Sequence, residues 1–318
     1  MSFLDKLSLA GLVPVIAIND AEDAVPLCRA LSEGGLPVAE ITFRSDAAEE
    51  AIRRVHAELP EVMLGAGTVL TCDQADRAIA AGAAYIVSPG INPRVVKHCQ
   101  DKGVAIVPGC ANPSNVETAL ELGLKTVKFF PAEALGGLKV IKAMAGPFGG
   151  VTFLPTGGIN EKNLNDYLSF PKIVACGGSW MAPEDAVKAG DWDRIRRLAR
   201  EAVDLMLGLT LAHVGINSGS PEQAEKDAKA IAALLSLPLK DGNSSVFAGA
   251  GFECMKKPFR GTHGHVAIGC NSAERARWHL ERRGFVFDES SASVKEGKLK
   301  AIYLKDEIAG FAFHLLAK

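Results

Sequence analysis

The stretch VPVIAINDAEDAVPLCRALSEGGLPVAEITF, residues 13–43, decides the fold of this chain. Two short runs of apolar and β-branched residues, Val13–Ile18 and Val38–Phe43, enclose a helix-like segment that ends at Gly34. Glycine is common directly after a helix because it adopts the left-handed backbone conformation without a Cβ clash. Apolar strands that alternate with helices predict a parallel sheet that is covered on both faces.

The same strand–helix rhythm continues through the first two thirds of the chain. Six further apolar runs follow: Met63–Val69, Ala84–Ser88, Val104–Pro108, Thr126–Phe130, Val151–Thr156 and Ile173–Cys176. Helix-like segments such as Ala47–Leu59 and Asp73–Ala81 lie between them. Eight such units predict an α/β fold of the (β/α)8 TIM-barrel type. An open doubly wound sheet is the alternative, but no GxGxxG follows the first strand, so we expect the barrel.

Composition and charge exclude several classes of protein. The 318 residues are 48% hydrophobic, which is enough for a substantial core. The 35 basic and 37 acidic residues give a formal charge of −2, whereas nucleic-acid and anionic-membrane proteins carry a basic excess. We therefore expect a small-molecule substrate, no nucleic acid and no membrane.

The cysteines and the N-terminal segment bear on the compartment. The seven cysteines include no CxxC pair, so reduced thiols in the cytoplasm are the simplest interpretation. The segment MSFLDKLSLAGL has an acid at Asp5 and no small-residue cleavage site, which does not fit a signal peptide. No apolar run approaches the roughly 18 residues that a membrane span needs.

The barrel pattern ends after a helix that we predict over Trp192–Leu207. Beyond it the segments at residues 211–235 and 263–284 resemble each other: LAHVGINSGSPEQAEKDAKAIAALL and HGHVAIGCNSAERARWHLERRG. Each contains a His-Val strand, a turn and a helix, and such a repeat predicts a duplicated βαβββ module. We therefore expect a barrel over residues 1–208 and a smaller α+β module over residues 209–318.

Lys128 stands in the otherwise apolar run TVKFFP, residues 126–131. A lysine here either points into the barrel or reaches solvent from the strand end. Inside an apolar barrel its ammonium group loses hydration, so we expect the pKa of Lys128 to fall. A neutral amine attacks a ketone to form a Schiff base, whose iminium lets a neighbouring carbon–carbon bond break. Lys125, at a strand start, and Lys139, in a predicted helix, are poorer candidates.

Glu40 lies in the run VAEITFR, residues 38–44, which ends at Arg44. Period-two alternation predicts that Glu40, Thr42 and Arg44 share one face of a strand. Two interpretations remain open: a structural ion pair, or a general acid/base beside a clamp for a substrate carboxylate. Schiff-base chemistry needs such an acid/base to remove water from the carbinolamine and to carry a proton to the enamine carbon. Glu40 is therefore our candidate for that role.

Glycine-rich turns follow the last two predicted strands of the barrel. Gly157 and Gly158 come after the seventh strand, and Gly177, Gly178 and Ser179 come after the eighth. In this architecture the loops after strands seven and eight bind phosphate through backbone N–H groups. The two turns therefore predict a phosphorylated substrate.

Eight motifs, in this order, resemble the class I 2-keto-3-deoxy-6-phosphogluconate / 4-hydroxy-2-oxoglutarate aldolase family. They are PVIAI (14–18), VAEITFR (38–44), GAGTV (65–69), SPG (88–90), KFFPAE (128–133), AGPF (145–148), PTGGI (155–159) and GGSW (177–180). The resemblance covers about residues 1–207. It implies a homotrimeric barrel that forms a lysine Schiff base and needs no cofactor. A metal-dependent aldolase is the competitor, but the barrel half contains only His56 and His98, both in helix-like segments.

The resemblance also implies roles for individual residues. Lys128 takes the place of the Schiff-base lysine, and Glu40 that of the general acid/base. The matching substrate contacts are Arg44 and Thr68 for the pyruvate carboxylate, Thr156 near the aldehyde portion, and Gly157, Gly158, Gly178 and Ser179 for phosphate. Asn112 departs from the family pattern, because many members carry threonine there.

The C-terminal module resembles the vicinal oxygen chelate superfamily of glyoxalases and ring-cleaving dioxygenases, most clearly in GHVAIG, residues 264–269. The metal positions that this resemblance implies are His213, Glu253, His265 and His314. Three nitrogens and one carboxylate suit zinc, nickel or iron(II). Glyoxalases usually have glutamate where this chain has His314. A degenerate module without metal is the alternative.

Together these features predict a lyase that cleaves 2-keto-3-deoxy-6-phosphogluconate to pyruvate and glyceraldehyde 3-phosphate. A second candidate substrate is 4-hydroxy-2-oxoglutarate, which would give pyruvate and glyoxylate. The alternatives concern the C-terminal module, which is either a metal-dependent enzyme in a bifunctional chain or a non-catalytic regulatory or assembly module.

Overall fold

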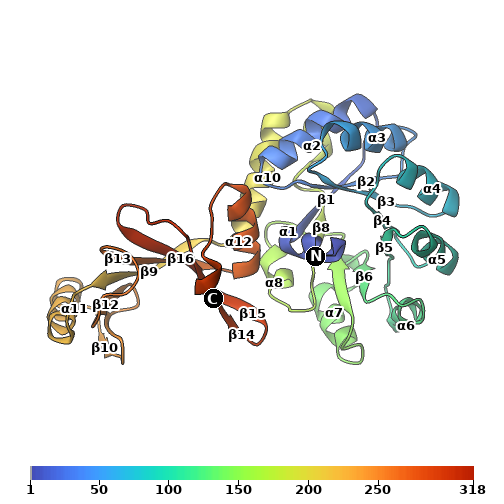
Figure 1. Ribbon diagram of the computed structural model, residues 1–318. Coiled ribbons are helices and arrows are strands. Elements are labelled where there is room, and N and C mark those ends of the chain that lie inside the picture. Colours follow the sequence, from blue (N-terminus) through green and yellow to red (C-terminus); the bar gives the residue numbers. More distant parts are fainter. Residues whose placement is uncertain (1) are drawn as a thin grey trace. The chain divides into compact units, whose positions relative to one another are not determined.

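The computed structural model describes residues 2–318, which form two compact units that divide between Met206 and Leu207 (Figure 1). The first unit contains parallel strands that alternate with helices. The second unit contains one mixed sheet, two α-helices and one short 3-10 helix.

The strands of the first unit close into a barrel. They are β1 (Leu12–Ile16), β2 (Val38–Thr42), β3 (Met63–Gly67), β4 (Tyr85–Val87), β5 (Ala105–Val107), β6 (Thr126–Phe129), β7 (Thr152–Pro155) and β8 (Cys176–Gly178). The order β5-β4-β3-β2-β1-β8 forms one parallel sheet, and β6 pairs with β7. Bridges between Gly109 and Lys128 and between Thr156 and Gly177 join that pair to β5 and to β8. This closure confirms the predicted (β/α)8 barrel and excludes the open sheet.

The helices follow the strands in the order that the sequence predicts. They are α1 (Phe3–Ala10), α2 (Ala24–Glu33), α3 (Ala48–Glu58), α4 (Cys72–Ala80), α5 (Pro93–Asp101), α6 (Pro113–Glu121), α7 (Gly137–Ala145), α8 (Leu164–Leu168), α9 (Glu184–Lys188) and α10 (Trp192–Leu207), with short 3-10 helices η1 (Ala21–Asp23) and η2 (Glu133–Leu135). Side chains that accept N-terminal N–H groups begin several of them: Thr71 caps α4, Asn92 caps α5 and Asn112 caps α6.

Helix α1 precedes the first barrel strand and covers one end of the barrel. The ring of Phe3 stacks on Tyr85 with 4.5 Å between centroids, and Leu7 is fully buried. Because Tyr85 is the first residue of β4, this contact lies at the amino-terminal end of the strands. The opposite, carboxyl-terminal end is where enzymes of this fold carry their active sites.

The second unit contains one eight-stranded sheet in the order β10-β11-β12-β9-β13-β16-β15-β14. Its strands are β9 (Thr210–Asn217), β10 (Leu239–Asp241), β11 (Ser245–Ala248), β12 (Phe252–Met255), β13 (Gly264–Cys270), β14 (Ser293–Lys295), β15 (Lys298–Tyr303) and β16 (Phe311–Ala317). The element order βαβββ occurs twice. Strands β9 and β13, one from each half, pair antiparallel at the centre of the sheet.

Each half of this sheet carries one helix. Helix α11 (Pro221–Leu235) packs on β11 and β12, and α12 (Ala273–Arg282), which is followed by η3 (Glu289–Ser291), packs on β15 and β16. Small residues make the first contact close: Ala224 and Ala228 of α11 meet Val246 and Cys254 in a buried cluster. The predicted duplicated α+β module is therefore what the chain forms.

Candidate active site

Lys128 and Glu40 meet inside the barrel. Lys128 Nζ, from β6, lies 3.3 Å from Glu40 Oε1, from β2, and only 5% of Lys128 and none of Glu40 is exposed. A contact between strands on opposite sides of the barrel requires both side chains to point into its interior. The structure thus places Lys128 inside rather than in solvent, whereas Lys125 and Lys139 are exposed.

Two glycines of β3 make room for the side chains of Glu40 and Tyr85. A Cβ at Gly67 would lie 2.2 Å from Glu40 Oε1, and a Cβ at Gly65 would lie 2.2 Å from the ring of Tyr85. Tyr85 is fully buried and donates a hydrogen bond of 3.3 Å to the Ala39 carbonyl. Burial, and then the charge of Glu40, raise the pKa of Tyr85 well above its ordinary value, so its hydroxyl remains protonated. Tyr85 is thereby an uncharged neighbour of the Glu40 carboxylate.

Two buried oxygen atoms at this end of the barrel have no hydrogen-bond partner among the described residues: Glu40 Oε2 and Thr156 Oγ1. A buried polar atom without a partner is costly, so natural proteins rarely keep one without a function. Thr156 follows β7, and a Cβ at Gly177 would lie 2.4 Å from its hydroxyl oxygen. Both atoms are therefore available to a ligand that enters from the carboxyl-terminal end.

Arg44 does not lie on the strand face that we predicted. Strand β2 ends at Thr42, all five of its residues are buried, and Arg44 follows the strand as an exposed residue. The period-two pattern fails here because a barrel strand is buried on both faces and because the chain turns away after Thr42. Glu40 pairs with Lys128 instead, so the Glu40–Arg44 ion pair is not formed.

Thr68, directly after β3, adopts a left-handed backbone conformation with φ of 57°. This conformation is rare for a β-branched residue and costs about 1–3 kcal/mol, and such strain is concentrated at functional sites. Thr68 and Arg44 both follow the carboxyl ends of neighbouring strands, β3 and β2. The structure therefore brings the two predicted carboxylate contacts to the same side of the barrel.

The Gly157–Gly158 turn directs its carbonyl groups toward the protein. Gly157 O accepts from the Glu133 backbone N–H at 3.0 Å, and Gly158 O accepts from the side-chain amides of Asn160 and Asn163, each at 3.1 Å. Both glycines have positive φ, 99° and 83°. Within residues 2–318 no hydrogen-bond acceptor is found for the backbone N–H groups of either glycine.

The second predicted turn is similar. Gly178 ends β8, and Ser179 is exposed beyond it, with a backbone N–H that no described residue accepts. Free N–H groups beside satisfied carbonyls form an electropositive site that suits an anion. The two turns thus have the electrostatics that phosphate binding requires.

The sequence alone did not reveal the roles of three residues near the site. Phe130 lies with its ring centroid 5.3 Å from Lys128 Nζ, Gly177 makes room for Thr156, and Tyr167 donates a hydrogen bond to Glu133. The first two lie inside motifs that the sequence analysis quoted, so the signal was present. Asn112 acquires a structural role, because its side chain accepts from Asn115 N as the cap of α6, a position that threonine also favours.

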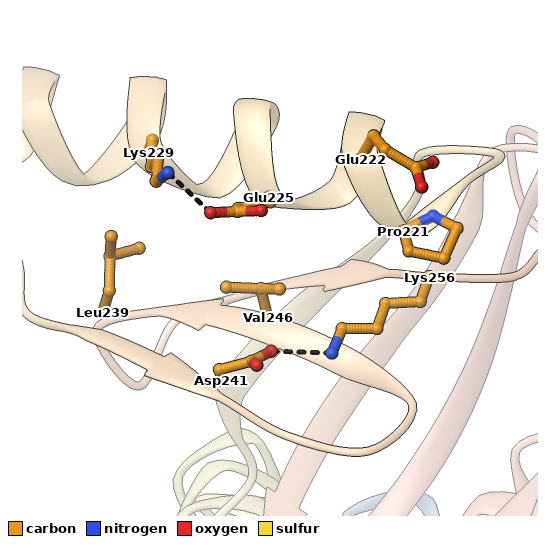
Figure 2. A pocket seen from close by; sticks show the side chains of 8 residues that line it. All are labelled: Pro221, Glu222, Glu225, Lys229, Leu239, Asp241, Val246 and Lys256. Carbon is orange, nitrogen blue, oxygen red and sulfur yellow. Dashed lines mark hydrogen bonds and ion pairs between the residues drawn. The ribbon is translucent and has the colours of Figure 1, made fainter.

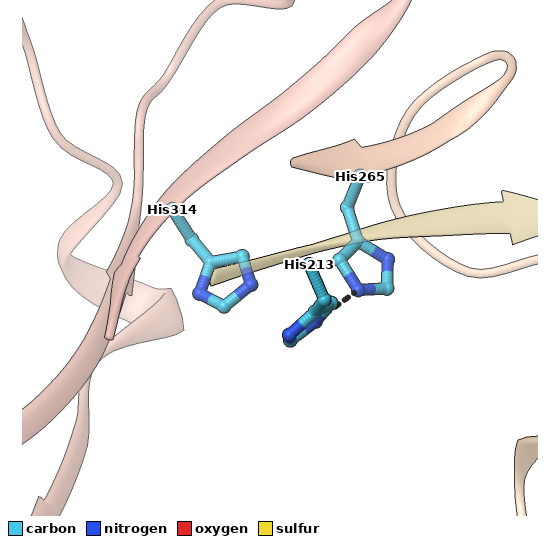
Figure 3. Close-up of side chains that lie close together, drawn as sticks. All are labelled: His213, His265 and His314. Carbon is cyan, nitrogen blue, oxygen red and sulfur yellow. Dashed lines mark hydrogen bonds between the residues drawn. The ribbon is translucent and has the colours of Figure 1, made fainter. Parts of the chain in front are cut away.

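A second cluster of titratable side chains lies in the C-terminal unit (Figure 3). One ring nitrogen from each of His213, His265 and His314 lies within 4.8 Å of the others. Glu253 joins them: its Oε2 lies 3.3 Å from His213 Nε2 and 3.1 Å from His265 Nε2. The four residues come from β9, β12, β13 and β16, so both halves of the duplicated module contribute.

Groups outside the cluster orient two of its four side chains, His314 and Glu253. His314 Nδ1 donates to the Leu315 carbonyl at 3.1 Å, so the buried Nε2 atom keeps a lone pair, and it has no partner among the described residues. Ser245 donates to Glu253 Oε1 at 2.6 Å, which leaves Oε2 to the cluster. Burial lowers the pKa of His314 to about 4, so the ring is neutral at physiological pH.

Glu253 is ionised in this environment. Burial alone would raise the pKa of its carboxyl, but hydrogen bonds from His213, His265 and Ser245 outweigh burial and hold the pKa well below its ordinary value. A Cβ at Gly215 would lie 2.0 Å from the His265 ring, so β9 needs glycine there.

A hollow elsewhere in this unit does not involve the histidines. It is lined by residues of α11, β10 and β11, with Glu222, Asp241 and Lys256 at its charged edge (Figure 2). Lys256 Nζ pairs with Asp241 at 2.7 Å, so these charges neutralise each other. Among the described residues, no helix has the length and apolar character that a bilayer span requires.

A lysine amine enclosed in a (β/α)8 barrel beside a carboxylate defines a class I aldolase, which breaks carbon–carbon bonds through a Schiff base. The family model described as KDPG and KHG aldolase matches residues 4–198. The chain belongs to this family.

Known proteins agree over the first unit. The 2-dehydro-3-deoxy-phosphogluconate aldolase of Haemophilus influenzae is 50% identical over 203 residues, which are 64% of this chain and 96% of that protein. The KHG/KDPG aldolase of Escherichia coli K12 is 45% identical over 198 residues, 62% of this chain and 93% of that protein.

Solved structures agree as well. KDPG aldolase from Legionella pneumophila, with pyruvate captured as a covalent carbinolamine intermediate, superposes with a TM-score of 0.61 at 38% identity over 63% of this chain and 98% of that chain. The enzyme from Zymomonas mobilis with 3-phosphoglycerate gives 0.59 at 44% identity over 63% and 94%.

Proposed function

We propose that this chain cleaves 2-keto-3-deoxy-6-phosphogluconate to pyruvate and glyceraldehyde 3-phosphate, and 4-hydroxy-2-oxoglutarate to pyruvate and glyoxylate. The observation that carries the proposal is the buried contact of 3.3 Å between Lys128 Nζ and Glu40 Oε1. The printed names of the relatives support the two substrates, and the carbinolamine in the Legionella structure supports the covalent mechanism.

In this mechanism Glu40 first takes a proton from Lys128, the freed amine adds to the C2 ketone, and loss of water gives an iminium ion. Glu40 supplies the proton that leaves with that water. The carboxylate of Glu40 then accepts, through a water, the proton of the C4 hydroxyl. At the same time the C3–C4 bond breaks and the aldehyde departs. The C3 carbon of the resulting enamine takes this proton back, and hydrolysis releases pyruvate and the amine. The iminium is the electron sink, so the proposed cleavage needs no metal or other cofactor.

The remaining predicted residues bind the substrate in this proposal. Arg44 and Thr68 hold the carboxylate, and the free Thr156 hydroxyl contacts the aldehyde portion. The phosphate lies on the free N–H groups of Gly157, Gly158 and Ser179, with Gly178 beside them in the second turn. The electrostatics of the two turns and the orphaned Thr156 oxygen support these assignments.

Reduction of the Schiff base tests the mechanism. Borohydride with pyruvate should add a pyruvyl mass to Lys128, which peptide mass spectrometry locates. Lys128→Ala should give no adduct, and the control Lys125→Ala, at an exposed position, should give a normal one. An unmodified wild-type protein, or an adduct that persists in Lys128→Ala, would refute the mechanism.

We propose further that the protein is a cytoplasmic homotrimer. The family resemblance supports the trimer, and the seven cysteines, all of them free thiols, support a reducing compartment. Light scattering on the purified protein tests the trimer, because the mass of a monomer or a dimer would contradict it.

For the C-terminal unit we propose that His213, Glu253, His265 and His314 hold a divalent metal ion. The three mutual distances among His213 Nε2, His265 Nε2 and Glu253 Oε2 are 3.1–3.3 Å. Ligands about 2.0–2.1 Å from a tetrahedral ion are about 3.3 Å apart, so the residues fit zinc. A bound ion would supply Lewis acidity, while Ser245 and the Leu315 carbonyl orient its ligands.

Metal analysis of the full-length protein decides between this proposal and a non-catalytic module. After incubation with zinc, nickel or iron(II) and desalting, we expect close to one ion per chain, and a loss of most of it in His265→Ala. The control His98→Ala changes a histidine of the barrel surface, which pairs with Asp76. Wild-type protein that retains none of the three ions would refute the metal site and favour a regulatory or assembly role.

A further inference from the structure

Glu133 and Tyr167 form a hydrogen-bonded pair that the mechanism above does not use. The Tyr167 hydroxyl donates to Glu133 Oε1. Tyr167 lies in α8 and is 2% exposed, whereas Glu133 begins η2 and reaches the surface. Burial, and then the bond to Glu133, raise the pKa of the Tyr167 phenol above its ordinary value. The hydroxyl therefore keeps its proton and remains a donor at neutral pH.

This pair lies against the Gly157–Gly158 turn. The Glu133 backbone N–H donates to Gly157 O at 3.0 Å. A Cβ at Gly158 would lie 2.6 Å from both Cβ and Cγ of Glu133, so the glutamate side chain packs on the bare face of that glycine. Glu133 therefore contacts both glycines of the turn that carries the free N–H groups.

The same pair connects the turn to the strand that carries the reactive amine. Lys128 and Glu133 belong to one short segment, KFFPAE, residues 128–133. Tyr167 belongs to α8, the helix that follows the glycine turn. At Gly137 a Cβ would lie 2.7 Å from Glu133 Oε1 and 2.8 Å from the Tyr167 hydroxyl, so α7 also closes around the bond.

We propose that Glu133 and Tyr167 are positioning residues that fix the phosphate turn relative to Lys128 and so favour phosphorylated over unphosphorylated 2-keto acids. This inference rests on the aldolase function proposed above. A carboxylate beside an anion site repels the anion, so its presence there needs another explanation. The hydrogen bond from Tyr167 and the steric contact with Gly158 supply that explanation.

The test compares two substrates in three variants. Tyr167→Phe removes only the donor, and Glu133→Ala removes the acceptor and the contact with Gly158. Each should raise KM for 2-keto-3-deoxy-6-phosphogluconate about fivefold or more, the scale of one hydrogen bond. The KM for 4-hydroxy-2-oxoglutarate, and kcat for both substrates, should stay within about twofold. Glu133→Gln keeps an oxygen acceptor and should restore KM to nearly the wild-type value.

Asp166→Ala is the matched control, because it removes an exposed carboxylate from the same helix, α8. Equal rises in KM for both substrates, or none, would overturn the inference, as would a lower KM in Glu133→Ala, which indicates simple repulsion. If one variant fails to fold, the other decides. Failure of the aldolase proposal is seen separately, because wild-type protein would then form no pyruvate adduct on Lys128.

Discussion

Glu40 is held by neighbours that leave one of its two oxygens to a ligand. Oε1 contacts Lys128 Nζ, and Oε2 has no partner among the described residues. The side chain is fully buried, so its neighbours restrict its movement. The space that it occupies exists because β3 has glycine at position 67. The geometry of the proposed acid/base therefore depends on Gly67, which has no side chain.

Gly67→Ala should reduce cleavage much more than it reduces stability. The new methyl group would lie 2.2 Å from Glu40 Oε1, so the carboxylate must leave its place beside Lys128. We expect kcat to fall by about 100-fold or more, the usual contribution of a positioned acid/base. Gly149→Ala, at a site with nothing within 4 Å, is the control and should keep full activity. Normal kcat in Gly67→Ala would contradict this role of the glycine.

Some residues of the site were predictable and others were not, for physical reasons. Lys128 and Glu40 were identifiable because a charged side chain in a buried apolar strand requires a partner. The exposed position of Arg44 was not, because alternation gives no warning of where a strand ends. The Glu133–Tyr167 bond joins residues of different elements, and no local pattern announces such a contact.

At the scale of elements, the order of strands and helices was predictable and their ends were less so. The run Ala84–Ser88 was expected as a strand, but β4 covers only Tyr85–Val87. The flanking residues Ala84 and Ser88 each donate one backbone hydrogen bond to a neighbouring strand, to Leu64 O at 2.8 Å and to Val107 O at 3.5 Å, but they do not extend the strand. Hydrophobicity reports burial, and ladder bonds are set by the neighbouring strand.

Helix α1 should contribute measurably to the stability of the barrel, because Leu7 is fully buried and Phe3 stacks on Tyr85. Leu7→Ala should lower the free energy of unfolding by about 2–5 kcal/mol, the range for a buried leucine. Leu70→Ala, at a leucine that is 51% exposed, should change it by less than about 0.5 kcal/mol. Denaturant unfolding measures both changes in free energy. A change in Leu7→Ala as small as that expected for Leu70→Ala would show that α1 is not part of the core.

At the scale of the whole molecule, the chain is longer than its relatives. The Haemophilus influenzae aldolase is matched over 96% of its length by 203 residues here, and the second unit begins at Leu207. The sequence repeat predicted the architecture of that unit, since the two His-Val strands occupy equivalent places in it. The resemblance also implied that His213, Glu253, His265 and His314 come together, whereas the distances between their ligand atoms come only from the structure.

A fragment of residues 1–206 should fold and form the pyruvate adduct on Lys128, because the barrel strands and the site residues all lie within it. Circular dichroism and borohydride trapping check this, with the same fragment carrying Lys128→Ala as the control. A fragment that is unfolded, or folded but unreactive toward pyruvate, would show that the second unit is needed for the aldolase.

The strands of the barrel are not joined equally. Within residues 2–318, β6 and β7 share a regular ladder, whereas isolated bridges at Gly109, Ile173 and Gly177 join this pair to β5 and β8. The strand pair β6–β7, which carries Lys128, is thus joined to the rest of the barrel wall by fewer ladder pairs than the other strands. Its amides should therefore exchange with deuterium sooner than those of β1 to β3, because fewer ladder bonds hold its two edges.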